Sequence, residues 1–247
     1  MTNSWLEVIP DPEIQALLDQ YAQWGGVIQY VIGRAPGLAP PAASHHGMAL
    51  FTMATLLRRH NEEVLQRASA QGLPPETFQQ LRPKEPPTQQ AGRMVDPAVF
   101  FGPQFDVNAG KLILRGRSPN YLNRYFYFDA EEKPATVIYE YLRPGHDHPY
   151  YQGFTKGYAG AFTDPPYGLS VYANNQIRTL PKVEVNQLFL ALNQALFGSL
   201  ATMQIYEWPT DWSPYFDAGH EWWGSFLWTL YNPSQQWMVG VAASTTD

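Results

Sequence analysis

The spacing of apolar residues predicts helices in the first part of the chain. The run Asp11-Pro12-Glu13 is a typical helix start, with a capping carboxylate, a proline in the first turn and an acid at the positive end of the dipole. Apolar residues recur at helical spacing as far as Tyr21, and Gly25-Gly26 ends this helix. A second helix is expected from Ser44, as its cap, to about Gly72.

The segments around these helices are less regular. Residues 27–32 form a short apolar run that fits either a strand or a helix, and the proline-rich residues 34–46 predict a loop. Proline and glutamine dominate residues 74–97, which is typical of a linker or a surface arm.

Beyond residue 100 the pattern changes to strands. Residues 112–115 form one candidate strand, and residues 125–128 and 136–142 are expected to form a hairpin. The stretch 144–172, rich in Gly, Pro and Tyr, predicts an extended loop with one strand at 169–172.

The last third of the chain predicts a helix and a hairpin. Apolar residues from Val185 to Met203 form one helical stripe, and the turn Asn232–Gln235 joins two apolar strands. This turn places the following residues opposite one another: Trp228 and Val239, Leu230 and Trp237, Phe226 and Val241. The apolar stripe of the helix is the expected cover for this face of the hairpin.

These elements predict an α+β fold, an antiparallel sheet with packed helices, preceded by a helical N-terminal part. We expect residues 1–98 to form this helical part with its Pro/Gln-rich arm, and residues 99–247 to form the sheet domain. The two parts are expected to form one integrated unit.

Composition narrows the class of function. Of the 247 residues only 15% are charged, against about 25% in ordinary domains, whereas aromatic residues reach 15%. The net charge of −6 argues against nucleic acid and favours a basic protein partner. The chain has no cysteine, no pattern of a signal peptide at its start, and no apolar stretch of the roughly 20 residues that cross a membrane. A cytoplasmic protein is expected.

The run His220-Glu-Trp-Trp-Gly224 begins like the H-E-x-x-H signature of zinc peptidases. That signature needs two histidines four residues apart on one helical face, and here glycine replaces the second and a strand follows. Asp217, His220 and Glu221 remain candidate ligands on a loop. The alternative is a loop anchored in the core by Trp222 or Trp223, with polar residues at its rim.

Other candidate sites are incomplete as well. His146 and His148 would point the same way in an extended segment, as two metal ligands do, but a third ligand is missing nearby. We therefore expect neither a metal nor another cofactor. Arg115, Arg117 and Arg124 lie among tyrosines, which suits single-stranded nucleic acid, but charges that keep a strand edge soluble are the simpler interpretation. No motif for a Ser, Thr or Lys nucleophile is present.

The loop between residues 146 and 167 is the best candidate for a binding surface. Tyrosine, glycine and asparagine are typical of recognition loops, because tyrosine offers a large contact area at low entropic cost. A packed loop that covers the sheet with its own rings is the alternative.

The tail resembles the C-terminal end of small uncharacterised bacterial proteins, some of which are similar to immunity proteins that neutralise toxins. The resemblance rests on WSPYFDAGHEWWGSFLWTLY, residues 212–231, and on the closing ASTTD, residues 243–247. It covers the last quarter of the chain. It implies binding rather than catalysis, and it assigns no catalytic residue.

We therefore expect a bacterial immunity protein that binds a cognate, basic toxin and neutralises it. The alternatives are a small hydrolase, with or without a metal, that uses His146 and His148 or the Asp217 to Glu221 group, and an assembly component whose Pro/Gln-rich arm is a contact strand. Oligomeric state does not follow from the sequence. The expected binding residues are Asp147, Tyr150, Tyr151, Tyr158, Asp164, Tyr167, Asp217 and Glu221.

Overall fold

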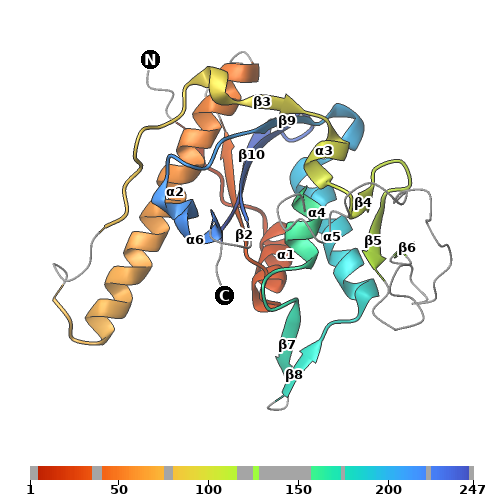
Figure 1. Cartoon of the computed structure of the whole chain (residues 1–247), viewed down its shortest axis with the longest axis horizontal. Helices are drawn as coiled ribbons and strands as arrows, with labels where there is room; N and C mark the ends of the chain where they lie inside the picture. Colours follow the sequence, from red (N-terminus) through yellow and green to blue (C-terminus); the bar gives the residue numbers. More distant parts are fainter. Residues whose placement is uncertain are drawn as a thin grey trace. The chain divides into compact units, whose positions relative to one another are not determined.

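The computed structural model describes residues 5–34, 41–74, 80–115, 125–127, 157–173, 176–220 and 224–244. The chain forms two compact units, and each unit is assembled from segments that are far apart in the sequence (Figure 1). Unit 1 consists of Met1–Ile9, Ile28–Met94 and Gln204–Thr246, and unit 2 of Pro10–Val27, Val95–Met203 and Asp247. Residues 1–98 thus contribute to both units.

The predicted α+β class is confirmed, and unit 1 carries the main sheet. Within the described residues this sheet has six strands in the order β1-β2-β11-β10-β9-β3, so the two ends of the chain meet in it. The pairs from β1 to β9 are antiparallel. The strands are β1 (Leu6–Glu7), β2 (Ile28–Arg34), β3 (Arg93–Val95), β9 (Gln204–Glu207), β10 (Ser225–Asn232) and β11 (Trp237–Ser244).

The 30-residue helix α2 (Pro41–Ala70) packs on this sheet against β2, β10 and β11 (Figure 1). The helix begins at Pro41, so Ser44 lies inside it, where its side chain is buried, and the prediction that Ser44 is the cap is wrong. In the described part of the chain, α2 and the other helices lack the combination of length and apolar character that a membrane crossing requires. The buried residues between helix and sheet are Val31, Met48, Ala49, Met53, Leu56, Trp208, Trp212, Phe216, Leu227, Met238 and Ala242.

The C-terminal hairpin exists, but its predicted register is wrong by two residues. Trp228 lies opposite Val241, and the last pair is Asn232 with Trp237. Asn232 stays in the strand because its side-chain Oδ1 accepts hydrogen bonds from the backbone N–H groups of Ser234 and Gln235, so the turn begins one residue later. A shift of two residues leaves each side chain on the same face.

The helix that packs on this hairpin is α2, which is a second correction. It contacts the face that carries Leu227 and Met238, opposite the face that carries Trp228. The predicted cover, α5 (Lys182–Phe197), has the expected buried stripe but packs against α1 (Pro12–Gln23) in unit 2.

Unit 2 is built around a cluster of aromatic rings. Tyr21 of α1 stacks on Phe162 of α4 at 4.2 Å between centroids, and Phe100 of α3 stacks on Tyr158 of α4 at 4.8 Å. Phe101, Phe105, Phe189 and Phe197 complete the cluster. Its helices are α1 (Pro12–Gln23), α3 (Pro97–Phe101), α4 (Gly157–Thr163) and α5.

Most of the predicted local elements of unit 2 are confirmed. Asp11 caps α1, since its Oδ1 accepts from the backbone N–H groups of Glu13 and Ile14 at 3.0 and 2.9 Å. Residues 136–142, the predicted partner of the strand at 125–128, lie outside the described residues. The short strands are β4 (Phe105–Asp106), β5 (Lys111–Arg115) and β6 (Tyr125–Tyr127) in one sheet, and β7 (Ser170–Ala173) and β8 (Gln176–Thr179) in a hairpin.

One position limits how closely α2 approaches the sheet. A Cβ atom on Gly240 would lie 1.8 Å from Oγ1 and 2.7 Å from Cβ of Thr52, whereas a Cβ on Gly33 would meet only ends of side chains, at 3.1 Å or more. Gly240→Ala should therefore lower the free energy of unfolding by about 3 kcal/mol, at the upper end of overpacking, and Gly33→Ala by less than about 1 kcal/mol. Urea titration of both variants measures this difference. Equal losses would show that the contact at Gly240 is not tight.

Candidate functional site

The structure tests the predicted binding residues only in part. Asp147, Tyr150, Tyr151 and Glu221 lie outside the described residues, as do His146 and His148. The other four fall into different units: Tyr158, Asp164 and Tyr167 belong to unit 2, and Asp217 belongs to unit 1.

Tyr158 is part of the core of unit 2 rather than of a surface loop. It lies in helix α4, is 0% exposed, and contacts Phe100, Phe162 and Phe189. The short helix places it there because Gly157, at φ +57°, approaches the backbone of α3 so closely that a Cβ would lie 2.7 Å from it. The ring of Tyr158 therefore cannot contact a partner.

Tyr167, in contrast, is 79% exposed. It lies in the turn after α4, where the backbone N–H of Gly168 donates to the carbonyl of Pro165 at 2.8 Å and Gly168 adopts a φ of +69°. Asp164 is half-buried at the start of the same connection. This tight turn presents the tyrosine ring to solvent.

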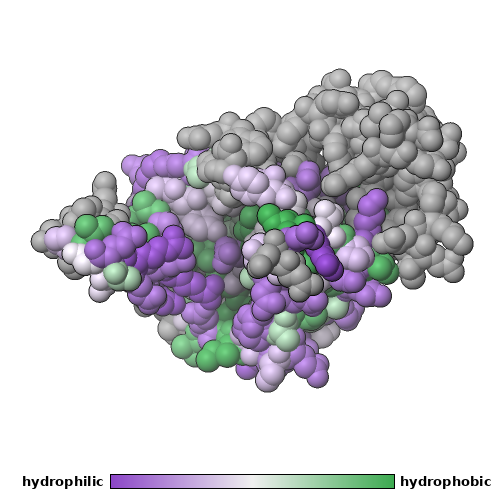
Figure 2. All heavy atoms as spheres, turned by 90° about the horizontal axis from the view of Figure 1, so that it is seen from below, coloured by the Kyte–Doolittle hydropathy of each residue, from purple (hydrophilic) through white to green (hydrophobic). Residues whose placement is uncertain are grey.

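The hairpin of β7 and β8 follows directly and exposes two further large apolar side chains. Tyr172 is 73% and Ile177 is 76% exposed, and the two residues lie opposite each other in the register. Figure 1 shows this hairpin extending away from the helices of its unit, and Figure 2, viewed from that side, shows hydrophobic residues among hydrophilic ones. We call Tyr167, Tyr172 and Ile177 the hairpin surface.

The hairpin is fixed to the rest of unit 2 at its base. The backbone N–H of Ser170 donates to the carbonyl of Trp24, at the end of α1, at 3.0 Å. Leu169 and Leu180, which flank the two strands, are buried. The hairpin surface is therefore held on an anchored element. The two short β-compatible runs around Asn174-Asn175 are the sequence signal that could have predicted it.

Charge is distributed unevenly between the two units. The described residues of unit 1 include seven acidic and seven basic side chains, whereas those of unit 2 include seven acidic and four basic ones. Three of the acids, Asp11, Glu13 and Asp19, lie on or next to α1, which has no basic residue. The excess of negative charge among the described residues thus belongs to the unit that carries the hairpin surface.

The HEWWG run starts at the last residue of the short helix α6 (Asp217–His220) and ends at Gly224, directly before β10. Glu221, Trp222 and Trp223, and with them the predicted tryptophan anchor, lie outside the described residues. The backbone N–H of Gly224 donates to the carbonyl of Gly219 at 2.8 Å, and a Cβ on Gly219 would lie 2.3 Å from the oxygen of Gly224. Nε2 of His220 is 2.8 Å from Oγ1 of Thr210, and Asp217 pairs with Lys84 at 3.4 Å. Both polar side chains thus have structural partners in unit 1.

No group of three or more His, Asp or Glu side chains in the described ranges is arranged to hold a metal ion. The segment with His146 and His148 is not among those ranges. The expectation that the protein binds no stoichiometric metal therefore stays a prediction.

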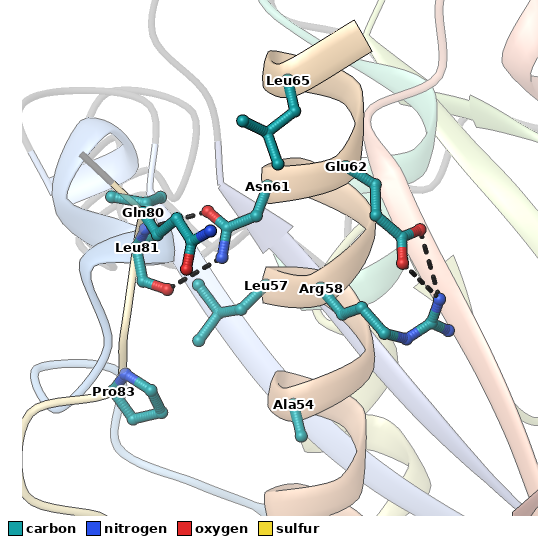
Figure 3. A pocket seen from close by; sticks show the side chains of 9 residues that line it. All are labelled: Ala54, Leu57, Arg58, Asn61, Glu62, Leu65, Gln80, Leu81 and Pro83. Carbon is teal, nitrogen blue, oxygen red and sulfur yellow. Dashed lines mark hydrogen bonds and ion pairs between the residues drawn. The ribbon is translucent and has the colours of Figure 1, made fainter. Parts of the chain in front are cut away.

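A groove of about 410 Å³ runs along α2 where residues 80–92, the strap, pass beside the helix (Figure 3). Asn61 reaches across to the strap: its Nδ2 donates to the carbonyl of Leu81 at 3.0 Å, and its Oδ1 accepts from the N–H of Leu81 at 2.9 Å. Arg58 and Glu62 also line the groove and pair with each other. The polar side chains of Arg58, Glu62 and Asn61 are thus engaged in these bonds, and the lining residues form no catalytic arrangement.

The strap belongs to the predicted Pro/Gln-rich arm, residues 74–97. Nε2 of His46 donates to the carbonyl of Pro87 at 2.8 Å, and the backbone N–H of Lys84 donates to the carbonyl of Trp212 at 2.8 Å. Together with the two hydrogen bonds between Asn61 and Leu81, these bonds hold the strap against the rest of unit 1.

Among the described residues, a buried histidine of unit 1 has a strongly lowered pKa. His45 of α2 is 0% exposed, its Nδ1 is 2.9 Å from Oγ1 of Thr229, and its ring stacks on Tyr206 at 4.4 Å. Thr229 also accepts a hydrogen bond from Nε1 of Trp208 at 2.9 Å. Burial lowers the pKa of His45 to about 3, so the ring is neutral at pH 7. A fully buried ring cannot reach a substrate, and we assign it a structural role.

Comparisons of the chain with protein-family models, with curated proteins and with solved structures find no match. Its function has to be inferred from its own surfaces and charges.

The buried His45 predicts a specific loss of stability in acid. Its pKa is about 3 in the folded state and about 6.5 when unfolded, so below pH 6.5 the unfolded chain binds a proton that the folded chain does not. Between pH 6.5 and pH 4.5 this should lower the free energy of unfolding by about 2.5 kcal/mol, at 1.36 kcal/mol per unit. Urea titrations at both pH values should show a weaker pH dependence for His45→Leu and an unchanged one for the exposed His60→Gln. Parallel curves for His45→Leu and the native chain would contradict it.

Two tyrosines of the predicted loop should behave in opposite ways. Tyr158→Ala removes a ring from the core and should cost about 3–5 kcal/mol, as large-to-small core changes do. Tyr167→Ala removes an exposed ring and should stay within about 0.5 kcal/mol. Thermal melting of both variants tests this assignment, which fails if Tyr167→Ala is the more destabilised.

Proposed function

We propose that the chain is a bacterial, cytoplasmic protein-binding module, and that it acts as an immunity protein by binding and neutralising a basic toxin. The observation that carries the binding role is the hairpin surface, where three large side chains are each more than 70% exposed, two on the anchored hairpin and one in the turn before it. Tyrosine is among the residues that contribute most binding energy in protein interfaces. Contiguous patches of exposed apolar side chains are a common sign of an interaction surface.

The charge of unit 2 supports a basic partner. An excess of carboxylates attracts a positively charged protein at long range and raises its association rate, while buried aromatic contacts slow dissociation. Both kinds of group occur in this unit. The acids Asp11, Glu13 and Asp19 lie on or next to α1. The C-terminal end of α1 is hydrogen-bonded to the start of β7, the first strand of the hairpin. The resemblance of the tail to immunity-type proteins supports the same role.

The test is protection of a bacterial host against the toxin-like protein encoded nearest to this gene, followed by measurement of the dissociation constant. The double variant Tyr167→Ala/Tyr172→Ala should weaken binding by at least about 2 kcal/mol, or roughly 30-fold, and reduce protection. Its melting midpoint should not change, because both rings are exposed. Leu6→Ala, at a side chain of unit 1 that is 69% exposed, is the matched control and should bind normally.

Full affinity of the double variant with an intact fold would move the interface elsewhere, in the first place to the segment with Tyr150 and Tyr151. Absence of any protection would contradict the immunity role itself. The hydrolase alternative makes a different prediction: Asp217→Ala or His220→Ala would then abolish function while leaving binding intact.

A further inference from the structure

The β7–β8 hairpin is bonded to the end of α1 at the base of its β7 edge, whereas its β8 edge is open. Ser170 donates its backbone N–H to Trp24 rather than to β8, so its pair with Thr179 is one of the non-hydrogen-bonded pairs of an antiparallel ladder. Because the two kinds of pair alternate, Tyr172 and Ile177 also form a non-hydrogen-bonded pair. The outer edge of β7 is therefore covered at its base by α1.

The outer edge of β8 is the open one. In non-hydrogen-bonded pairs the N–H and C=O groups point away from the partner strand, so those of Ile177 and Thr179 face outward. Neither residue's backbone bonds to another element within the part of the chain that the structure describes. All four residues of β8 are exposed. Proteins usually protect such an edge with lysine, proline or a bulge, and β8 has only Arg178.

We propose that the open edge of β8 pairs with β8 of a second copy of this chain, in an antiparallel arrangement centred on Ile177. The outward N–H and C=O of Ile177 then bond to the same groups of the second copy, which satisfies a two-fold axis. The two hairpins form one four-stranded ribbon. Four apolar side chains then lie side by side across one face of this ribbon: Tyr172 and Ile177 of one copy, followed by Ile177 and Tyr172 of the second copy.

Charge and chain geometry disfavour the registers centred on the next two residues. Centring on Arg178 would place two like charges opposite each other, which destabilises a pair. Centring on Thr179 would bring the second strand against Pro181, which has no N–H, at the start of α5. With the centre at Ile177, Arg178 of each copy lies opposite the uncharged Gln176 of the other.

This pairing extends the hairpin surface and leaves the face that carries Tyr172 and Ile177 free for a partner. The edge groups form the contact between copies, while the row of Tyr172 and Ile177 side chains stays open and doubles in length. The inference does not depend on a toxin partner, because the dimer is expected from the protein alone. A single four-residue edge is smaller than the standard interface of about 800 Å² per partner, so we expect a weak dimer. Its dissociation constant should lie between about 1 μM and 1 mM.

Sedimentation equilibrium of the full chain between about 1 μM and 1 mM tests the proposal, because dissociation constants in this range correspond to weak association. Gln176→Glu places a carboxylate opposite Arg178 twice and should lower the dissociation constant about three- to ten-fold. Gln176→Lys places like charges there and should raise it by a similar factor. Position 176 is exposed and lies opposite Ala173 in its own hairpin, so neither change should alter the melting midpoint.

Ile177→Pro supplies the second arm of the test. It deletes the outward N–H without removing a bond inside the hairpin, and it should leave a monomer with an unchanged melting midpoint. A native chain that stays monomeric at about 1 mM would overturn the proposal. So would a dimer that persists in Ile177→Pro, or changes of the same sign in Gln176→Glu and Gln176→Lys.

Discussion

Unit 1 depends on the close approach of α2 to its sheet, and this approach depends on the absence of a side chain at Gly240. Thr52 of the helix occupies the space above this glycine, and its hydroxyl donates to the carbonyl of Met48 at 2.7 Å. The helix therefore presents a satisfied polar group to the backbone of β11 rather than a bulky apolar one. A larger residue at either position would separate the layers and open the core beneath.

The contacts that flank this point follow from the same short distance. Because α2 lies close to the sheet, His45 can reach Thr229. Thr229 also accepts from Trp208, which directly follows the neighbouring strand β9. Trp208 in turn packs beside Gly92 of the strap, where a Cβ would lie 2.4 Å from its ring. The helix, the sheet and the strap are thus linked through one buried polar group and one indole.

Local patterns predicted most of the elements, because their signals are local. The cap at Asp11, the stripe of α5 and the two strands of the C-terminal hairpin all depend on neighbours within a few residues. Whether α2 or α5 covers the hairpin depends on which helix packs its apolar face against the apolar face of the sheet. The periodicity of the sequence does not contain that information. The register error has a local cause, the side chain of Asn232, but turn length alone did not reveal it.

The candidate site was harder to predict, because exposure rather than composition decides it. Tyr158 and Tyr167 belong to the same tyrosine-rich stretch, yet one fills the core and the other faces solvent. Gly157 lets α4 approach α3 closely, and Tyr158 is buried there. Gly168 closes the turn that follows α4, and Tyr167 is exposed in that turn. The residue types therefore indicated the region of the candidate site, whereas backbone geometry determines which of its side chains are exposed.

The anchoring of the hairpin connects its stability with its capacity to bind. An isolated two-stranded hairpin is marginally stable in water, so β7 and β8 need support from elsewhere. The bond from Ser170 to Trp24 and the buried Leu169 and Leu180 supply it at the base, while Tyr172 and Ile177 further along the strands stay exposed. Support at one edge also fixes which backbone groups point outward at the other. The same hydrogen bond that holds the hairpin on α1 thereby determines the edge and the residues that a second strand can use.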